Sequence, residues 1–243
     1  MKASATLILS CLSIYLIGQD TTFYTKDWNK AESVFSASFY EVIQKSQDDT
    51  MRASALLYFK SGQIKRSKNY ANFKEKKLDG IYQEWFDNGN LKEDIEYSNG
   101  KFNGFLKTYW ENGQKKRLDS FKNGEFIRGE CFNGDGEVIS YYAYEVMPEF
   151  KGGMDALMKY LSEEIKYPKK ARRKNIQGLV IVGFVVNTDG SIYNIKIVKS
   201  INEELDKEAI RVVSGMPNWN AGRQDGEAIK VSFNLPVRYR LKN

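Results

Sequence analysis

The segment GLVIVGFVVNTDG, residues 178–190, decides the fold of the C-terminal part of this chain. Apolar residues recur there at every second position, namely Val180, Val182, Phe184 and Val186. This alternation is typical of a strand that buries one face. Asp189-Gly190 suits a tight hairpin turn, and Ile195 and Ile197 share one face of the returning strand. We therefore predict a β-hairpin.

Helical spacing is found on both sides of this hairpin. Before it, an apolar helix face is predicted by Met154, Leu157, Leu161 and Ile165. Pro168 ends this helix and can begin a short second one over residues 169–174, with Ala171 as its small apolar position. After the hairpin, Asn202 is a suitable N-cap for a helix from Glu203 to about Ser214. The buried stripe of this helix would consist of Leu205, Ala209, Val212 and Val213.

The final strand shows the same alternation as the hairpin. Its apolar positions are Ile229, Val231, Phe233, Leu235 and Val237, and polar residues or Pro236 stand between them. Because Pro236 has no N–H, we expect this strand at a sheet edge or with a bulge. The order helix, strand, strand, helix, strand predicts an α+β domain over residues 145–243, with an antiparallel three-stranded sheet packed on helices.

Residues 51–140 are repetitive. GIYQEWFDNG at 80–89 matches GFLKTYWENG at 104–113, an offset of 24 residues. Asn-Gly pairs, which favour type I′ turns, occur at 88–89, 99–100, 103–104, 112–113, 123–124 and 133–134. We therefore predict an array of antiparallel β-hairpins stacked into one extended sheet.

This array resembles the MORN repeat and its bacterial variants, with two clear copies between degenerate ones. The aromatic residues at the hairpin centres are Trp85, Phe86, Tyr109 and Trp110. We interpret them as sheet-packing residues. A binding face for lipid, glycan or protein is the alternative.

Residues 1–18 have the composition of a signal peptide. Lys2 precedes an apolar run over residues 7–18, which is shorter than the roughly 20 apolar residues of a spanning helix. We predict cleavage after Gly18; retention as a short uncleaved anchor and lipidation of Cys11 are the alternatives. Residues 19–50 form a lead-in segment, rich in aromatic residues, that we expect to be strand-rich and do not assign further.

The composition argues against catalysis and against metal or cofactor binding. The 243 residues include no His and two Cys, of which cleavage would leave Cys131, expected as an inert packed residue or a cross-link between two copies. The acid pairs Glu163–Glu164 and Glu203–Glu204 point apart on helices. We therefore predict no enzyme, no catalytic residue, no metal and no cofactor. The net charge of +6 comes without any nucleic-acid-binding motif, so no nucleic acid partner is expected.

Two further features of the C-terminal part have a structural interpretation. A basic cluster consists of Lys169, Lys170, Arg172, Arg173 and Lys174. We interpret it as a solvated helix face, with contact to anionic peptidoglycan, lipid or a partner as the alternative. Trp219 is expected to be a core anchor.

The C-terminal part resembles the TonB C-terminal domain family of energy transducers over about 95 residues. The matching positions are Pro148-x-Phe150-x-Gly152-Gly153, Tyr167-Pro168, the hairpin from Gly178 to Gly190, Asp206-x-x-Ala209, Met216-Pro217-x-Trp219-x-x-Gly222 and Leu235-Pro236-Val237. The resemblance implies that a TonB-box-like segment of an outer-membrane receptor is captured as an added β-strand on the final strand. The partner-binding residues would be Lys230, Ser232, Asn234, Arg238, Tyr239 and Arg240.

The chain also departs from this family. A full energy transducer carries a membrane-embedded His and a long Pro-rich spacer, whereas this chain has no His and four Pro. The resemblance therefore implies partner capture, while coupling to inner-membrane motor proteins is left open.

Together with the signal-peptide pattern, the resemblance implies a periplasmic TonB-like protein of the cell envelope that binds outer-membrane receptors and supports TonB-dependent energy transduction and transport. Retention of residues 1–18 would anchor it in the inner membrane. The alternative is an envelope scaffold whose MORN-like repeats bind protein, lipid or cell wall without force transduction. Further alternatives are a homodimer and an antitoxin-like repeat protein, and export of the chain argues against the latter.

Overall fold

The computed structural model describes residues 20–241. The predicted targeting segment, residues 1–18, lies outside them. Contacts divide the chain into two compact units with the boundary between Tyr141 and Tyr142. We call the first unit the array and the second the C-terminal unit.

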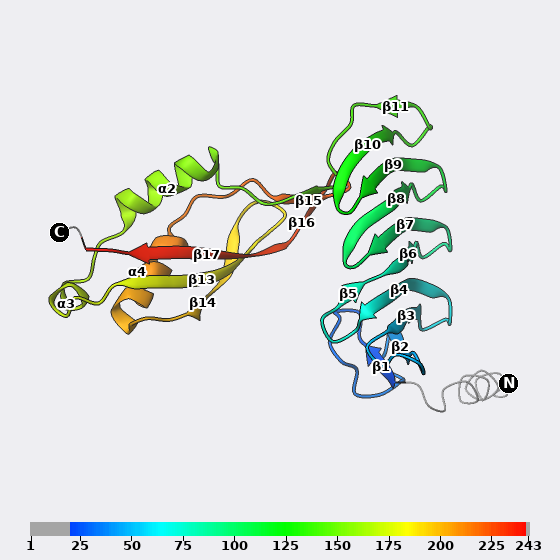
Figure 1. The fold of residues 1–243 in the computed structure, drawn as a ribbon, viewed down its shortest axis with the longest axis horizontal. Helices are drawn as coiled ribbons and strands as arrows, with labels where there is room; N and C mark the ends of the chain where they lie inside the picture. The colour runs from blue at the N-terminus through cyan, green and yellow to red at the C-terminus, as the bar shows by residue number, and fades with distance from the viewer. Residues whose placement is uncertain (1–19, 242–243) are drawn as a thin grey trace. The chain divides into compact units, whose positions relative to one another are not determined.

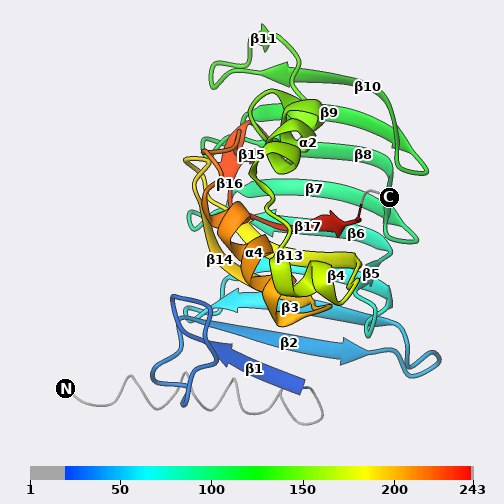
Figure 2. The ribbon, with the colours of Figure 1, turned by 90° about the vertical axis from the view of Figure 1, so that its left-hand side faces the viewer.

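The array is one antiparallel sheet of 11 strands whose order along the sheet follows the sequence, except that β5 pairs with β4 beside the main path (Figures 1 and 2). The strands are β1 (Asp20–Tyr24), β2 (Phe39–Lys45), β3 (Ala53–Phe59), β4 (Ile64–Asn72), β5 (Lys77–Leu78), β6 (Gly80–Trp85), β7 (Leu91–Ser98), β8 (Lys101–Tyr109), β9 (Lys115–Lys122), β10 (Glu125–Phe132) and β11 (Val138–Ile139). The predicted hairpin array is confirmed. It also begins earlier than residue 51, because the lead-in segment supplies β1 and β2.

The Asn-Gly pairs of the array do not share one conformation, and at 133–134 neither residue has positive φ, so the predicted type I′ turn is not formed there. Asn99-Gly100 and Asn123-Gly124 have positive φ at both residues, as a type I′ turn requires. At 88–89 and 112–113 the glycine alone has positive φ, so these turns are of another type. Asn103-Gly104 lies inside β8 and makes no turn, which corrects the sequence-based interpretation of that pair. The local dipeptide alone therefore does not determine where a strand ends.

The core of the array combines apolar and charged side chains. Leu57, Ile95 and Leu106 are buried from solvent. Arg117 and Asp119 are also fully buried, and the Arg117 Nη1 atom lies 2.7 Å from Asp119 Oδ2. A ladder of neighbouring rings, with centroids 5.0 to 6.4 Å apart, connects Tyr82, Tyr97, Phe102, Phe121, Phe126 and Tyr141. Each repeat adds one part of this ladder, which accounts for the aromatic residues in the period.

The C-terminal unit has the predicted order of helices and strands with one addition. Its main elements are α2 (Gly153–Glu164), α3 (Lys169–Arg173), β13 (Gly178–Val186), β14 (Ile192–Lys199), α4 (Glu203–Ser214) and β17 (Val231–Tyr239). The sheet order is β14-β13-β17. The addition is a second small sheet, which the sequence patterns did not predict, made of β12 (Glu145–Val146), β15 (Gly222–Gln224) and β16 (Glu227–Ile229).

The local sequence explains the geometry of the main hairpin and of α4. The alternating β13 residues Val180, Val182, Phe184 and Val186 are all buried. Gly190 has φ of 83°, and a Cβ atom there would lie 2.0 Å from the carbonyl oxygen of Trp219. Helix α4 begins at the expected N-cap, because the Asn202 side chain accepts a hydrogen bond from the Glu204 N–H.

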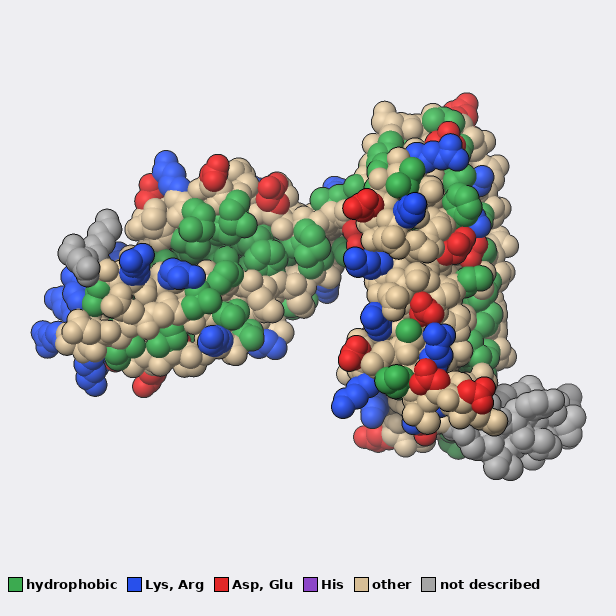
Figure 3. Space-filling view, in the orientation of Figure 1, with side chains coloured by type: hydrophobic (Ala, Val, Ile, Leu, Met, Phe, Trp, Pro, Cys, Tyr) green, Lys and Arg blue, Asp and Glu red, His purple; other side chains and the backbone are tan. Residues whose placement is uncertain are grey.

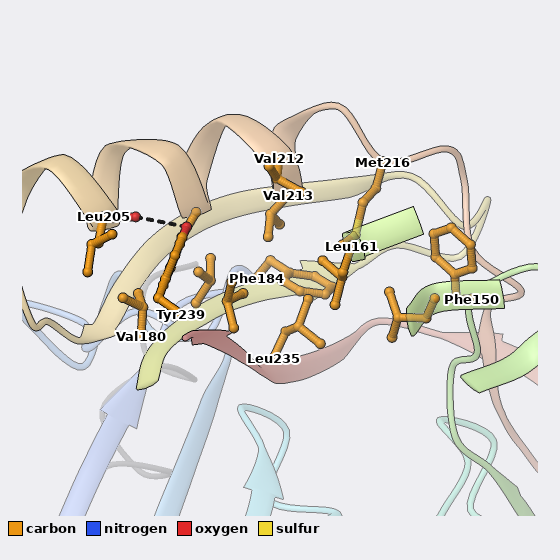
Figure 4. Packing of buried hydrophobic residues seen from close by; sticks show 14 of the residues in the cluster. Phe150, Leu161, Val180, Phe184, Leu205, Val212, Val213, Met216, Leu235 and Tyr239 are labelled. Atoms are coloured by element: carbon orange, nitrogen blue, oxygen red, sulfur yellow. Dashed lines mark hydrogen bonds between the residues drawn. The ribbon is translucent and has the colours of Figure 1, made fainter. Parts of the chain in front are cut away.

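The core of the C-terminal unit lies between α4 and the sheet, and Figure 4 shows α4 residues facing those of the strands. Helix α2 joins the same core through Leu157 and Leu161, and its Tyr160 hydroxyl donates to the Val212 carbonyl at 3.1 Å. Two expectations need correction. Met154, predicted on the buried face of α2, is 64% exposed. Ile229, predicted in the last strand, ends β16 instead.

Candidate functional site

Strand β17 forms one border of the main sheet in the C-terminal unit. It pairs with β13 over nine positions, from Gly178↔Tyr239 to Val186↔Val231. Its other edge has no strand partner among the described residues. An unpaired strand edge presents a row of backbone N–H and C=O groups that a further strand can bind.

The inward side chains of β17 hold the strand against the core. Leu235, Val237 and Tyr239 are buried, and the Tyr239 hydroxyl donates a hydrogen bond to the Leu205 carbonyl of α4 at 3.1 Å (Figure 4). Burial is the main cause that raises the pKa of Tyr239 above its ordinary value. Strand β17 is therefore already ordered by its packing against the core. Because it is ordered before a partner binds, binding costs less conformational entropy.

Pro236 indicates which backbone groups face outward. In an antiparallel ladder, pairs that exchange two hydrogen bonds alternate with pairs whose N–H and C=O groups point away from the partner strand. The β13–β17 ladder continues without a register shift through the pair Ile181↔Pro236. Because Pro236 has no N–H, we infer that it belongs to a pair of the second kind. Ser232, Asn234 and Arg238 have the same parity, so their N–H groups would point outward.

The structure brings most of the predicted partner-binding residues together along this strand. Ser232, Asn234 and Arg238 are exposed on β17, and Lys230 and Arg240 are exposed directly before and after it. Tyr239 differs, because its side chain is 2% exposed and bonded to α4. The Tyr239 side chain is therefore not exposed to a segment bound along β17, which corrects this part of the expectation. The alternation along β17 places the Tyr239 and Arg238 side chains on opposite faces of the strand, so the sequence pattern could have predicted that Tyr239 is buried.

An aromatic cluster supports the first half of β17. Trp219 is 3% exposed, and its ring centroid lies 5.1 Å from that of Phe233, 5.4 Å from Phe184 and 5.7 Å from Phe150. Its predicted role as a core anchor is confirmed. The Trp219 Nε1–H has no hydrogen-bond acceptor among the described residues, so ring packing rather than a polar contact holds the indole.

Sequence reasoning missed the small sheet that leads into β17. Asp225-Gly226 has positive φ at both residues and forms the turn between β15 and β16. The Asp225 N–H donates to the Tyr144 carbonyl, and the Gln224 side-chain amide donates to the Tyr144 hydroxyl at 2.9 Å. These contacts fix the start of β17. The Asp-Gly pair at 225–226 was a detectable hairpin signal.

The aromatic residues of the array contribute to packing. Trp85, Phe86, Tyr109 and Trp110 are all half-buried, and the Trp110 Nε1–H donates to the Phe132 carbonyl at 3.1 Å. The Lys116 ammonium lies 4.6 Å from the centre of the Trp110 ring. Cys131 is buried.

Residues 20–241 contain neither a metal-binding cluster nor a membrane-spanning helix. No group of three or more His, Cys, Asp or Glu side chains there is suited to hold a metal ion. No helix in this range combines the length and the apolar character needed to cross a membrane.

Comparisons with known families match a different family to a part of each unit. Residues 163–241 match the family described as Gram-negative bacterial TonB protein C-terminal. Residues 78–99 and 104–123 match the MORN repeat variant. Both resemblances predicted from the sequence are therefore confirmed.

Individual relatives lead to the same family. Protein TonB of Helicobacter pylori strain 26695 and that of strain J99 are each 31% identical over 83 residues, covering 34% of this chain. The chain spans 28% of the length of these curated relatives. Two solution structures of the Helicobacter pylori TonB-CTD are 28% identical, with TM-scores of 0.29 and 0.30; they cover 36% and 37% of this chain and 78% and 94% of their own.

Proposed function

We propose that this chain, whose residues 163–241 form a TonB-type C-terminal domain preceded by MORN repeat variants, binds an extended segment of a partner protein along β17. The partner would be an outer-membrane receptor, and the site of action the cell envelope, where capture supports transport across the outer membrane. The observation that carries this proposal is the unpaired outer edge of β17. The protein would then act by binding and not by catalysis.

The mechanism is strand addition. Backbone groups of the partner would pair with the outward N–H and C=O groups at Ser232, Asn234 and Arg238, while Pro236 contributes a carbonyl alone. Each such hydrogen bond stabilises the complex by about 0.5–1.5 kcal/mol. A few bonds of this size give reversible binding, as a protein that repeatedly engages receptors needs. Side chains of β17 would add selectivity.

The test removes one outward N–H without breaking the β13–β17 ladder. Asn234→Pro deletes that donor, and Asn234→Ala is the matched control that changes the side chain and keeps the donor. Binding of synthetic peptides that copy the periplasmic segments of the receptors would be measured with the full chain by fluorescence anisotropy. We expect Asn234→Pro to weaken binding about tenfold relative to Asn234→Ala, since one hydrogen bond is lost and the proline ring obstructs the edge.

A second variant tests the same edge in the opposite direction. Pro236→Ala restores a missing donor, so we expect binding to tighten by up to about tenfold. Circular dichroism would verify that each variant folds. Equal affinities of the two Asn234 variants, with no change in Pro236→Ala, would exclude strand addition on β17.

The array supports a second candidate role as a binding scaffold. Ile81 and Phe105 occupy equivalent positions of consecutive repeats and are 51% and 44% exposed. A cavity of about 250 Å³ lies beside Phe105 and is also lined by Leu118 and Arg128. Substitution of both Ile81 and Phe105 by Ser distinguishes the roles, because it would abolish retention of envelope proteins by a scaffold and leave peptide binding to β17 unchanged.

A further inference from the structure

We propose that two copies of this chain associate through the end of the array formed by β10 and β11, with the outer edges of their two β10 strands paired antiparallel. We call this end the open end and define it by five exposed side chains: Phe126, Ile127, Val138, Ile139 and Tyr141. Figure 3 shows hydrophobic side chains among charged ones over this end of the array. The inference goes beyond the proposed function, because it concerns the array and a second copy of the chain.

The open end lacks the polar surface that normally terminates a repeat array. Each inner repeat is covered by its neighbours, so a terminal repeat needs a polar outer surface to remain soluble. The open end instead contains five of the eleven large hydrophobic side chains that are exposed between residues 20 and 141. Such a concentration of exposed apolar side chains marks a site of protein contact.

The backbone of β10 is also incompletely paired at this end. Strand β11 pairs only with Cys131 and Phe132, so the outer edge of β10 over residues 125–130 has no strand partner among the described residues. A free edge of this kind can bind a further strand. A bulge at Ile127 interrupts the pairing of β10 with β9. Because the bulge limits the length of strand that can pair, we expect a weak and reversible contact.

The opposite end of the array is partly covered by its own loop. The backbone of residues 29–31 runs beside β1, where Tyr24 forms an antiparallel bridge with Lys30 and the Ala31 N–H donates to the Phe23 carbonyl at 2.9 Å. This loop obstructs head-to-tail stacking of arrays, which would produce a filament. Pairing of two open ends uses the same surface on both copies and therefore closes the assembly as a dimer.

The charges of the free β10 edge are complementary to themselves in the antiparallel direction. When two β10 strands pair about a symmetry axis between residues 126 and 127, Glu125 of each copy lies opposite Arg128 of the other. Glu125 pairs with Lys122 of β9 and Arg128 with Ser120, so both side chains lie on the same face of the sheet, and both are exposed. Opposite charges directly across two strands attract each other. The contact therefore contains two symmetry-related ion pairs.

The aromatic ladder of the array also ends at the open end. The Phe126 ring lies 5.7 Å from that of Phe121, and the Tyr141 ring lies 5.1 Å from Phe126 and is 42% exposed. A second copy would cover apolar area that a single chain leaves in water. The C-terminal unit begins directly after Tyr141, so a dimer would hold two copies of β17 in one particle. Capture of partners along β17 would then be bivalent.

Sedimentation velocity of the full chain over a range of concentrations measures this association. We expect a monomer–dimer equilibrium with a dissociation constant in the micromolar range. Ile127→Lys places a charge at the symmetry axis and should weaken the dimer at least about tenfold. Phe35→Lys is the matched control in the loop between β1 and β2, where Phe35 is 81% exposed, and it should leave the dimer unchanged.

A charge exchange tests the pairing of the two edges. Glu125→Arg and Arg128→Glu each place like charges opposite one another in a homodimer, so each variant alone should be monomeric. A mixture of the two variants restores opposite charges at both positions, and we expect a heterodimer with about the affinity of the unchanged chain. Circular dichroism would verify that each variant folds, as expected because both positions are exposed.

Other results would overturn the inference. A chain that stays monomeric at about 200 µM has no such contact, and receptor-peptide binding by that monomer would leave the proposed function intact. A dimer that persists in Ile127→Lys, or exchanged variants that stay monomeric when mixed, would exclude the β10 edge. Loss of a persisting dimer in Asn234→Pro would assign the contact to β17. Species larger than a dimer that disappear in Phe35→Lys would indicate head-to-tail stacking instead.

Discussion

The array and the C-terminal unit bury their side chains in different ways. In the array, each repeat contributes similar residues, and the interior includes the ion pair between Arg117 and Asp119. In the C-terminal unit, helices and strands distant in the sequence enclose an apolar core that includes Trp219 and Phe184. The array is thus built from neighbouring contacts, whereas the C-terminal unit depends on contacts between distant segments.

This difference affects the sheet edges, where further chains can bind. Each inner strand on the main path of the array pairs with a strand on both sides, so free strand edges on this path are confined to its two ends. The C-terminal unit has a sheet of three strands, and two of them, β14 and β17, lie at borders. A small sheet necessarily exposes a larger share of its strands, and β17 combines such a border with a rigid packed face.

The largest effect is expected from the buried ion pair of the array. Arg117→Ala would leave the Asp119 carboxylate buried with its charge uncompensated by Arg117, and should reduce the free energy of unfolding by about 3–5 kcal/mol. Hydrogen exchange of the β8 and β9 amides would measure this loss in the free energy of unfolding. The control Arg117→Met with Asp119→Leu should recover most of the loss, since it removes both charges. A loss under about 1 kcal/mol in Arg117→Ala would show that the pair is not buried as described.

A somewhat smaller effect is expected from the apolar core of the C-terminal unit. Leu205 is fully buried, so Leu205→Ala should reduce the free energy of unfolding by about 3 kcal/mol. Met154→Ala is the control, with an expected change within about 0.5 kcal/mol because Met154 is exposed. Hydrogen exchange of the α4 and β13 amides would measure both. A larger loss for Met154→Ala than for Leu205→Ala would support the helix face predicted from the sequence and contradict the structure.

The smallest effect is expected from pH. Burial raises the pKa of Tyr239 above its ordinary value of 10.0, so the folded state holds this proton more tightly than the unfolded state. The corresponding stability is fully present below pH 10 and decreases as the pH rises above it. Urea unfolding at pH 9 and pH 11 would measure how steeply the free energy of unfolding falls with pH. Tyr239→Phe should make this slope shallower, and an unchanged slope in that variant would mean that other groups cause the alkaline loss.

Most elements could be predicted because their causes are local. The alternation from Val180 to Val186, the Asn202 cap and the turn at Asp189-Gly190 depend on residues that are neighbours in the chain. The same holds for the repeat period, and the family resemblances depended on such motifs. The misassigned Asn103-Gly104 shows the limit of this reasoning. The dipeptide allows a turn, but β8 continues through it as one strand, with a register shift at this point in its pairing with β7.

The sequence by itself determined the two kinds of architecture, the alternation of β17 and the presence of Pro236 in it. The tertiary structure alone decided that β17 lies at a border, and that Tyr239 is bonded to α4 while Met154 is exposed. The physical reason is that periodicity fixes which side of an element is apolar. Which neighbours an element receives depends on the packing of segments far apart in the chain, and an open edge is a property of that packing.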